Sequence, residues 1–292
     1  MNILLACNEM VSLTGSPLYH YTLAKELRQQ GHRVFIFSIW GKRFKDLPRF
    51  GVIKYGSMHR NINFDLFLVS QPIMEEVIDK IRAKKVVNVV HSEYPCETPM
   101  THKRIDHYIA IRPEIKQHLI DYHEIPEDKI SVIYNGIDTK RFSTNKRKKH
   151  EGDYTKVVLP CSIHPLRAKF INYYTKQACE KYRVYIYGKT TGNAKIYRNE
   201  WVFISDEKEN IEDYIADADI VAGILLGRIN LEAYNMGIPN YIHDPDNPKK
   251  KYLYSIDKEE FNNRHNIKNV AKQITNLYEN TRSNKQDTYR WH

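Results

Sequence analysis

Three consecutive stretches decide the fold of this chain: "NILLAC" at 2–7, "SPLYHYTLAKELRQQG" at 16–31 and "HRVFIFSIW" at 32–40. The first and third are short, nearly continuous apolar runs, which are typical of strands buried on both faces of a parallel sheet. The middle stretch has the apolar spacing of an amphipathic helix, with Ser16 as its predicted N-cap and Gly31 as its predicted end. Together they predict a βαβ unit.

The alternation of strands and helices continues through the amino-terminal half. We expect helices at 73–83 and 114–122, and strands at "FDLFLVS" (64–70), "KVVNVVH" (85–91), "DHYIAIR" (106–112) and "ISVIY" (130–134). Strands punctuated by helices predict a parallel sheet with helices on both faces. Residues 1–145 are therefore interpreted as a Rossmann-like domain.

A charged stretch, "STNKRKKHEGDYT" at 143–155, interrupts the pattern, which then starts again. We expect helices at 170–181, at 211–216 and around Glu232, and strands at "KVVLPCSI" (156–163), "RVYIYG" (183–188), "WVFIS" (201–205), "DIVAGIL" (219–225) and "PNYIHD" (239–244). These elements predict a second Rossmann-like domain at 154–265. A last helix and a polar tail occupy 266–292.

Composition limits the class of protein. The formal net charge of +10 predicts attraction to an anionic partner, which could be nucleic acid, an acidic membrane surface or a phosphate-bearing small molecule. The amino terminus has no basic region typical of a signal peptide, and no apolar run reaches the roughly 18 residues of a spanning helix. The four cysteines form no CxxC pair. We expect a cytoplasmic protein, either soluble or peripheral to the inner face of a membrane.

Two parallel sheets predict that ligands bind in a cleft between their carboxyl ends, so the candidate residues should lie in strand-to-helix loops. The chain contains no G-x-G-x-x-G and no G-x-x-x-x-G-K-[ST]. Binding of nicotinamide or flavin cofactors and P-loop phosphoryl transfer therefore lack their sequence signatures.

Three blocks carry a resemblance to family 4 glycosyltransferases. They are "LTGSPLYHYTLAKELRQQGHRVFIFS" (13–38), "ISVIYNGIDTKRF" (130–142) and "ADIVAGILLGRINLEAYNMGIPNYIHD" (218–244), in the order that this family shows. The resemblance implies an α/β protein of GT-B architecture, with two Rossmann-like domains whose parallel sheets face each other across a cleft. It also implies transfer of a sugar, with retention, from a nucleotide-sugar donor, for which a UDP-sugar is the favoured choice. The donor is a co-substrate, so no resident cofactor is expected.

Glu232 and its neighbours are the candidate donor-binding residues. Glu232 is similar to the second Glu of the family's E-x7-E motif, which implies that its carboxylate accepts hydrogen bonds from ribose hydroxyls. Ile224 stands where the first Glu belongs, which leaves the donor sugar undefined. Backbone amides at the helix N-terminus near Gly227, with Arg228, are expected to contact the transferred sugar. The alternative is an ordinary solvent-facing Glu on a helix.

Arg167 and Lys169 resemble the family's basic pair, which neutralises the diphosphate as it departs. The alternative is a solvated loop. Gly15 and Ser16 lie in the first strand-to-helix loop, where the missing Cβ of Gly15 would allow the backbone to approach a phosphate or sugar. An ordinary turn is an equal alternative for Gly15.

His91 ends its predicted strand, so we expect it in the cleft, where the resemblance implies contact with the sugar or the acceptor. Glu93 could act as an acid-base partner, although a retaining front-face reaction needs no dedicated enzymic base, because the departing phosphate can accept the proton. Asp244 and Asp246 are interpreted as a turn, and no metal site is predicted.

The acceptor is left open by the sequence. A glycan or lipid is the default, and a basic surface would suit an anionic membrane. One alternative is a virus-type enzyme that glycosylates hydroxymethylated bases in DNA, for which the positive charge and the 21 tyrosines are suited. Another is a catalytically inactive protein that binds a nucleotide or sugar, because the first motif Glu is missing.

Overall fold

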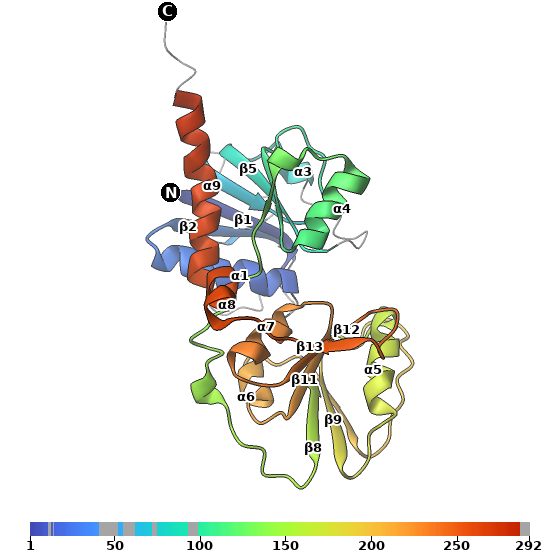
Figure 1. Cartoon of the computed structure of the whole chain (residues 1–292). Coiled ribbons are helices and arrows are strands. Elements are labelled where there is room, and N and C mark those ends of the chain that lie inside the picture. The colour runs from blue at the N-terminus through green and yellow to red at the C-terminus, as the bar shows by residue number, and fades with distance from the viewer. Residues whose placement is uncertain are drawn as a thin grey trace, which may run out of the picture. The chain divides into compact units, whose positions relative to one another are not determined.

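The computed structural model describes residues 1–10, 13, 15–40, 52–54, 62–71, 75–92 and 99–286. The chain divides into two compact units. The first comprises Met1–Gly136 together with Asn262–His292, and the second comprises Ile137–Phe261. Each unit contains one sheet with helices packed against it, as the alternating pattern predicts (Figure 1).

The first unit has a seven-stranded sheet in the order β3-β2-β1-β4-β5-β6-β7, and every neighbouring pair is parallel. Its strands are β1 (Asn2–Glu9), β2 (Arg33–Trp40), β3 (Val52–Lys54), β4 (Phe64–Val69), β5 (Ala83–Val90), β6 (His107–Ala110) and β7 (Ile130–Val132). Its helical segments are α1 (Gly15–Gln29), α3 (Glu75–Ile78), α4 (Pro113–His123), η3 (Glu127–Lys129) and α9 (Ile267–Gln286).

The start of α1 corrects one prediction. The helix begins at Gly15, so Ser16 lies inside its first turn and is not the N-cap. Ser16 is buried, and its carbonyl accepts a 2.8 Å hydrogen bond from Nδ1 of His20. The predicted end is confirmed: Gly31 has φ of +86°, a conformation that favours glycine, and follows the last helical turn.

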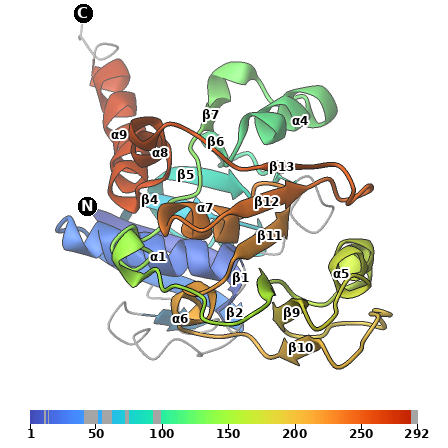
Figure 2. The ribbon, with the colours of Figure 1, turned by 60° about the horizontal axis from the view of Figure 1, so that its bottom comes forward.

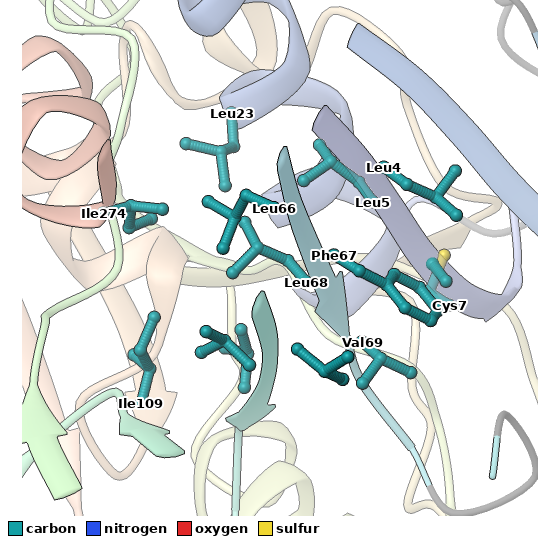
Figure 3. Close-up of a cluster of buried hydrophobic side chains, with 14 of the residues drawn as sticks. Leu4, Leu5, Cys7, Leu23, Leu66, Phe67, Leu68, Val69, Ile109 and Ile274 are labelled. Atoms are coloured by element: carbon teal, nitrogen blue, oxygen red, sulfur yellow. The ribbon is translucent and has the colours of Figure 1, made fainter. Parts of the chain in front are cut away.

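The core of the first unit joins β1 and β4 to helices from both ends of the chain (Figure 3). Leu23 of α1, Leu66 of β4 and Ile274 of α9 belong to this core, and all three side chains are completely buried. Burial of apolar surface is the dominant favourable term in folding, so α9 is an integral part of this core.

Polar contacts also hold α9 in the first unit. Lys85 Nζ donates to the carbonyl of Leu277 at 2.7 Å, and the Tyr278 hydroxyl donates to Asp65 Oδ1 at 3.1 Å. Figure 1 shows α9 beside α1, although their sequences lie at opposite ends of the chain.

The second unit has a six-stranded sheet in the order β10-β9-β8-β11-β12-β13. Its strands are β8 (Thr155–Leu159), β9 (Tyr182–Tyr187), β10 (Val202–Ser205), β11 (Ile220–Ile224), β12 (Asn240–His243) and β13 (Lys251–Leu253). Its helical segments are η4 (Thr144–Lys146), η5 (Pro165–Arg167), α5 (Ala168–Thr175), α6 (Ile211–Ile215) and α7 (Arg228–Asn235), and α8 (Lys258–His265) joins the two units. All neighbouring strands are parallel except β12 and β13.

Several elements differ from their predicted bounds. The described part of the helix expected at 73–83 is the short α3, and residues 72–74 lie outside the described residues. The helix expected to reach residue 181 ends at Thr175, because Cys179 and Tyr182 exchange two 2.9 Å backbone hydrogen bonds in a tight turn. The edge strand β13 was not expected, since its lysine-rich sequence has no strand pattern.

Candidate functional site

The strand order of each sheet reverses direction at one point, and open α/β sheets bind ligands outside the carboxyl ends of the strands at such a switch point. In the first unit the switch lies between β1 and β4, and in the second unit it lies between β8 and β11. The segments that follow these four strands are therefore the expected ligand-binding segments of the two units.

The segment after β8 carries Arg167 and Lys169. Arg167 ends η5, where its Nη1 donates a 2.8 Å hydrogen bond to Ser162 Oγ, and Lys169 lies in the first turn of α5. Both residues are exposed, as a solvated loop or a ligand-binding loop would require. Lys169 also lines an open pocket of about 400 Å³ between α5 and residues 247–249.

Close backbone packing fixes the position of the segment after β8. A Cβ on Gly188 would lie 2.0 Å from the carbonyl oxygen of Cys161, a contact that no side chain tolerates. Ile163 also exchanges backbone hydrogen bonds with Lys189 and Thr191, at 2.9 and 2.8 Å. The segment is thus held against the end of β9.

The segment after β11 leads into α7. Gly227 is the N-cap, with extended backbone, and its N–H donates to Asn230 Oδ1 at 3.3 Å. Asn230 is fully buried and also donates to the carbonyl of Tyr241 at 3.3 Å, which ties the start of α7 to β12. Figures 1 and 2 show α7 beside β11 and β12.

Arg228 and Glu232 form a buried ion pair on α7. Arg228 Nε donates to Glu232 Oε1 at 2.5 Å, and the two side chains are only 10% and 5% exposed. The interpretation of Glu232 as a solvent-facing helical residue is therefore wrong. Burial raises the pKa of Glu232, and the neighbouring Arg228 opposes that rise. Arg228 Nη1 is buried and has no hydrogen-bond partner among the described residues.

Each switch point has a strand that is followed by a non-glycine residue with positive φ. These strands are β4 in the first sheet and β11 in the second. Leu225, directly after β11, has φ of 56°, and Gln71, two residues after β4, has φ of 75°. Such conformations cost about 1 kcal/mol or more and persist where the surroundings impose them. The backbone N–H of Leu225 donates to the carbonyl of His243 at 3.1 Å, and Gln71 Oε1 accepts from the backbone N–H of Asn8 at 2.8 Å.

In the first unit, Gly15 and Ser16 follow β1, while Ser70 follows β4 and His91 follows β5. A Cβ on Gly15 would meet no atom of the described residues within 4 Å, so packing against them does not require glycine there. Ser70 Oγ lies 3.3 Å from Nε2 of His91 and also 3.3 Å from Nε2 of His20. Tyr19 packs its ring edge-on to His91, with ring centroids 4.9 Å apart.

The structure thus gathers the predicted residues into two groups, one in each unit. Arg167, Lys169, Gly227, Arg228 and Glu232 lie in the segments that flank the switch point of the second sheet, while Gly15, Ser16 and His91 follow strands of the first sheet. Glu93 lies outside the described residues.

Sequence reasoning missed Ser70, His20 and Asn230. Ser70 is the polar residue that ends the apolar run "FDLFLVS", which was the signal that could have found it. His20 and Asn230 lie within helices and become recognisable only through their buried contacts.

Asp244 and Asp246 form the predicted turn. Asp244 Oδ1 accepts backbone hydrogen bonds from Asp246 and Asn247, both at 2.8 Å. Within the described residues, no group of three or more His, Cys, Asp or Glu side chains is arranged to hold a metal ion. A helix long and apolar enough to cross a membrane is likewise absent from the described ranges.

Two of the three sequence blocks that resemble family 4 contact each other in the second unit: the end of the block at 130–142 and the block at 218–244. Asn235, at the end of α7, donates its side-chain Nδ2 to the carbonyls of Thr139 and Phe142, at 3.2 and 2.6 Å. Asp138 Oδ1 in turn accepts from the backbone N–H of Arg141 at 3.0 Å. The segment "IDTKRF" is therefore a brace for α7.

Comparison with known proteins identifies the architecture. Residues 82–141 match the model of Glycosyltransferase Family 4, whereas no curated protein matches the chain. The Anabaena protein HepE in complex with UDP is 12% identical, with a TM-score of 0.71 over 96% of this chain and 100% of that one. HepE is also known in complex with UDP-glucose.

Two further solved structures share the fold. A glycosyltransferase from Rickettsia africae ESF-5 is 16% identical, with a TM-score of 0.63 over 95% of this chain and 88% of that one. An alpha-glucosyltransferase in complex with UDP and a 13-mer DNA containing a HMU base is 11% identical, with a TM-score of 0.59 over 83% of this chain and 80% of that one. The chain therefore has the GT-B fold and is similar to family 4 glycosyltransferases.

Proposed function

We propose that this protein is a glycosyltransferase that moves a sugar from a UDP-sugar to a hydroxyl of a glycan or lipid, with retention and without a bound metal. The observation that carries the proposal is a donor on α7: Arg228 Nη1 is buried and has no partner in the part of the chain that the structure describes, beside the buried carboxylate of Glu232, at a switch point of the sheet. A buried unpaired donor costs free energy, which an anionic ligand would recover. The UDP complexes of HepE support the same type of donor.

Glu232 and Arg228 would bind different parts of the donor, the ribose and the diphosphate. A carboxylate has acceptor capacity on both oxygens, so Glu232 can keep its hydrogen bond to Arg228 and also accept from ribose hydroxyls. Arg228 Nη1 would donate to a diphosphate oxygen, with help from the first-turn N–H groups of α7. Hydrogen bonds of Asn230 near the start of α7 and of Asn235 at its end hold this helix in place before the donor arrives.

Arg167 and Lys169 would act on the leaving group. As the bond between the anomeric carbon and the diphosphate oxygen breaks, its electron pair stays on that oxygen and negative charge grows there. Fixed cations at that position stabilise the transition state more than the bound donor, which raises kcat. The departing oxygen accepts the proton of the acceptor hydroxyl as the new glycosidic bond forms, so no dedicated protein base is needed. His91 would contact a hydroxyl of the sugar or acceptor.

The test is donor turnover by the full chain. The protein is incubated with UDP-glucose and other UDP-sugars, and UDP release and acceptor products are measured by mass spectrometry. Transfer or donor hydrolysis that disappears in the double variant Arg228→Met/Glu232→Leu supports the proposal, provided that this variant stays folded and that Lys181→Met retains full activity. Lys181 is a suitable control because its exposed ion pair with Asp153 lies at the amino ends of β8 and β9. Binding of UDP without any turnover would favour an inactive nucleotide-binding protein.

A DNA acceptor is a second candidate, favoured by two observations. The chain carries a net charge of +10, and it shares its fold with an alpha-glucosyltransferase bound to DNA containing a HMU base. Duplex DNA containing hydroxymethylated bases is therefore included among the acceptors. A mass increment of one hexose on the digested nucleoside would establish this alternative. Consumption of the UDP-sugar without modification of the DNA would favour a glycan or lipid acceptor.

A further inference from the structure

A continuous line of hydrogen bonds runs under His91 in the first unit. It starts at the carbonyl of Ser16, which lies 2.8 Å from His20 Nδ1, and passes from His20 Nε2 to Ser70 Oγ at 3.3 Å. From Ser70 Oγ it continues to His91 Nε2, again at 3.3 Å. His20 and Ser70 are completely buried, whereas His91 is partly exposed at the end of its strand.

The chemistry of the two ends sets the direction of each bond. A carbonyl oxygen only accepts, so His20 Nδ1 must carry a hydrogen. Charging a fully buried imidazole is costly, and in the uncharged ring with its hydrogen on Nδ1 the Nε2 of His20 is a lone-pair acceptor. Ser70 has one hydroxyl hydrogen, which it donates to His20. Ser70 Oγ is then available to His91 only as an acceptor, and His91 Nε2 must donate to it.

The opposite tautomer of His91 would break this line. Its Nε2 lone pair would face the Ser70 oxygen, and the single hydroxyl hydrogen cannot serve both histidines. Burial lowers the pKa of His91 to about 4, so the ring is neutral near pH 7 and has one protonated nitrogen. With the hydrogen on Nε2, the other nitrogen, Nδ1, is an acceptor.

We infer that Ser70 and His20 are positioning residues that hold His91 as the Nε2–H tautomer, so that its Nδ1 accepts a hydrogen bond from a hydroxyl of the sugar or acceptor. The tautomer follows from the hydrogen-bond line with both imidazole rings uncharged, whereas the hydroxyl partner rests on the proposed glycosyltransferase function. The arrangement selects a ligand group that can donate a hydrogen bond, which a hydroxyl can do and an ether or carboxylate oxygen cannot.

The first arm of the test measures tautomers directly. Two-bond proton–nitrogen spectra of the full chain, labelled with ¹⁵N-histidine, are recorded near pH 7, and His91→Gln assigns the His91 signals among the 13 histidines. The expected result is the Nε2–H form for His91 and a mixture of both forms in Ser70→Ala. Observation of the Nδ1–H form in the wild type, or an unchanged tautomer in a folded Ser70→Ala, would overturn the inference.

The second arm measures catalysis. Ser70→Ala should lower kcat/KM in proportion to the fraction of His91 that leaves the Nε2–H form, about twofold for an even mixture, and Ser70→Thr should restore it by returning the hydroxyl. Ser131→Ala is the matched control, since it removes another Ser–His hydrogen bond, the 2.8 Å contact with His107 Nε2 at the opposite ends of the strands. An equal loss in Ser131→Ala would mean that the effect is one of stability and would overturn the positioning role. If no UDP-sugar is turned over, the proposed function fails, while the tautomer arm still decides the inference.

Discussion

Arg228 and Glu232 lie one turn apart on α7 and form an ion pair of 2.5 Å that is almost wholly buried. In the proposed site, each side chain therefore makes two interactions, an ion pair with its partner on the helix and a hydrogen bond to the donor. Removing either residue leaves the other as an uncompensated buried charge. A single substitution consequently cannot separate a loss of donor binding from a loss of stability.

The pair predicts a difference between single and double variants. Glu232→Leu alone should lower the free energy of unfolding by about 3 kcal/mol, because the Arg228 charge stays buried without its partner. The double variant Arg228→Met/Glu232→Leu should recover most of that loss, since apolar side chains of similar size replace both charges. Both proteins should bind UDP at least tenfold more weakly. Urea unfolding and calorimetric titration with UDP measure the two quantities, and a double variant that binds UDP normally would exclude this pair from the donor site.

Arg167 and Lys169 should behave differently, because both are exposed. Substitution of either by Met should leave the melting temperature nearly unchanged and lower kcat by about a hundredfold, the loss of roughly 3 kcal/mol of transition-state stabilisation. Steady-state kinetics with the donor measure the effect, with Lys181→Met as the exposed control. A lower kcat shared by that control would remove the specific role.

Two glycines offer a sharper contrast. Gly188→Ala should destabilise the second unit by about 2 kcal/mol or more and displace the Arg167 segment, because the new Cβ would collide with the carbonyl of Cys161. Gly15→Ala should be neutral for stability, since the new Cβ would lie more than 4 Å from every atom that the structure describes outside its chain neighbours and the backbone of its own helical turn. If the backbone of Gly15 approaches the ligand, this variant should still raise the donor or acceptor KM. Thermal melts and kinetics on both variants distinguish these effects, and a Gly15→Ala protein with wild-type kinetics would assign that glycine to an ordinary helix start.

The buried histidine His265 predicts a pH-dependent stability. Burial lowers its pKa from 6.5 to about 4, even though its Nδ1 lies 3.1 Å from the carbonyl of Asn135. The unfolded chain therefore binds a proton at higher pH than the folded chain. The contribution is fully present above pH 6.5 and is lost as the pH falls towards 4, by up to about 3 kcal/mol for this residue. Urea unfolding between pH 7.5 and 4.5 should show the decline, and His265→Gln should make it shallower. An equally steep decline in that variant would assign the acid sensitivity to other groups.

The sequence allowed the fold to be predicted because the strands are buried on both faces and read as apolar runs. "NILLAC" and "HRVFIFSIW" became β1 and β2, and the predicted second sheet is present from β8 to β12. The strand β13 was missed because Lys251–Leu253 is exposed and pairs at a sheet edge, where no apolar pattern is required. Helix ends were the least predictable part, as the start of α1 and the end of α5 show.

The sequence predicted those site residues that are charged and match a family motif, but not the contacts that depend on the folded structure. Arg167, Lys169 and Glu232 follow strands in a pattern that resembles a known family, so the sequence pointed to them. The pairing of Glu232 with Arg228 required the helix to be in place, although the spacing of four residues was consistent with it. The contact of His20 with Ser70 joins residues 50 positions apart, and nothing in a single sequence connects them.

The return of α9 to the first unit has a consequence for how the chain is made. Leu23 and Leu66 leave the ribosome long before Ile274, which belongs to the same core. The second unit, Ile137–Phe261, is a single continuous segment and can complete its core while translation continues. The first unit begins to emerge before the second but must wait longer than it, with part of its apolar core uncovered until α9 emerges.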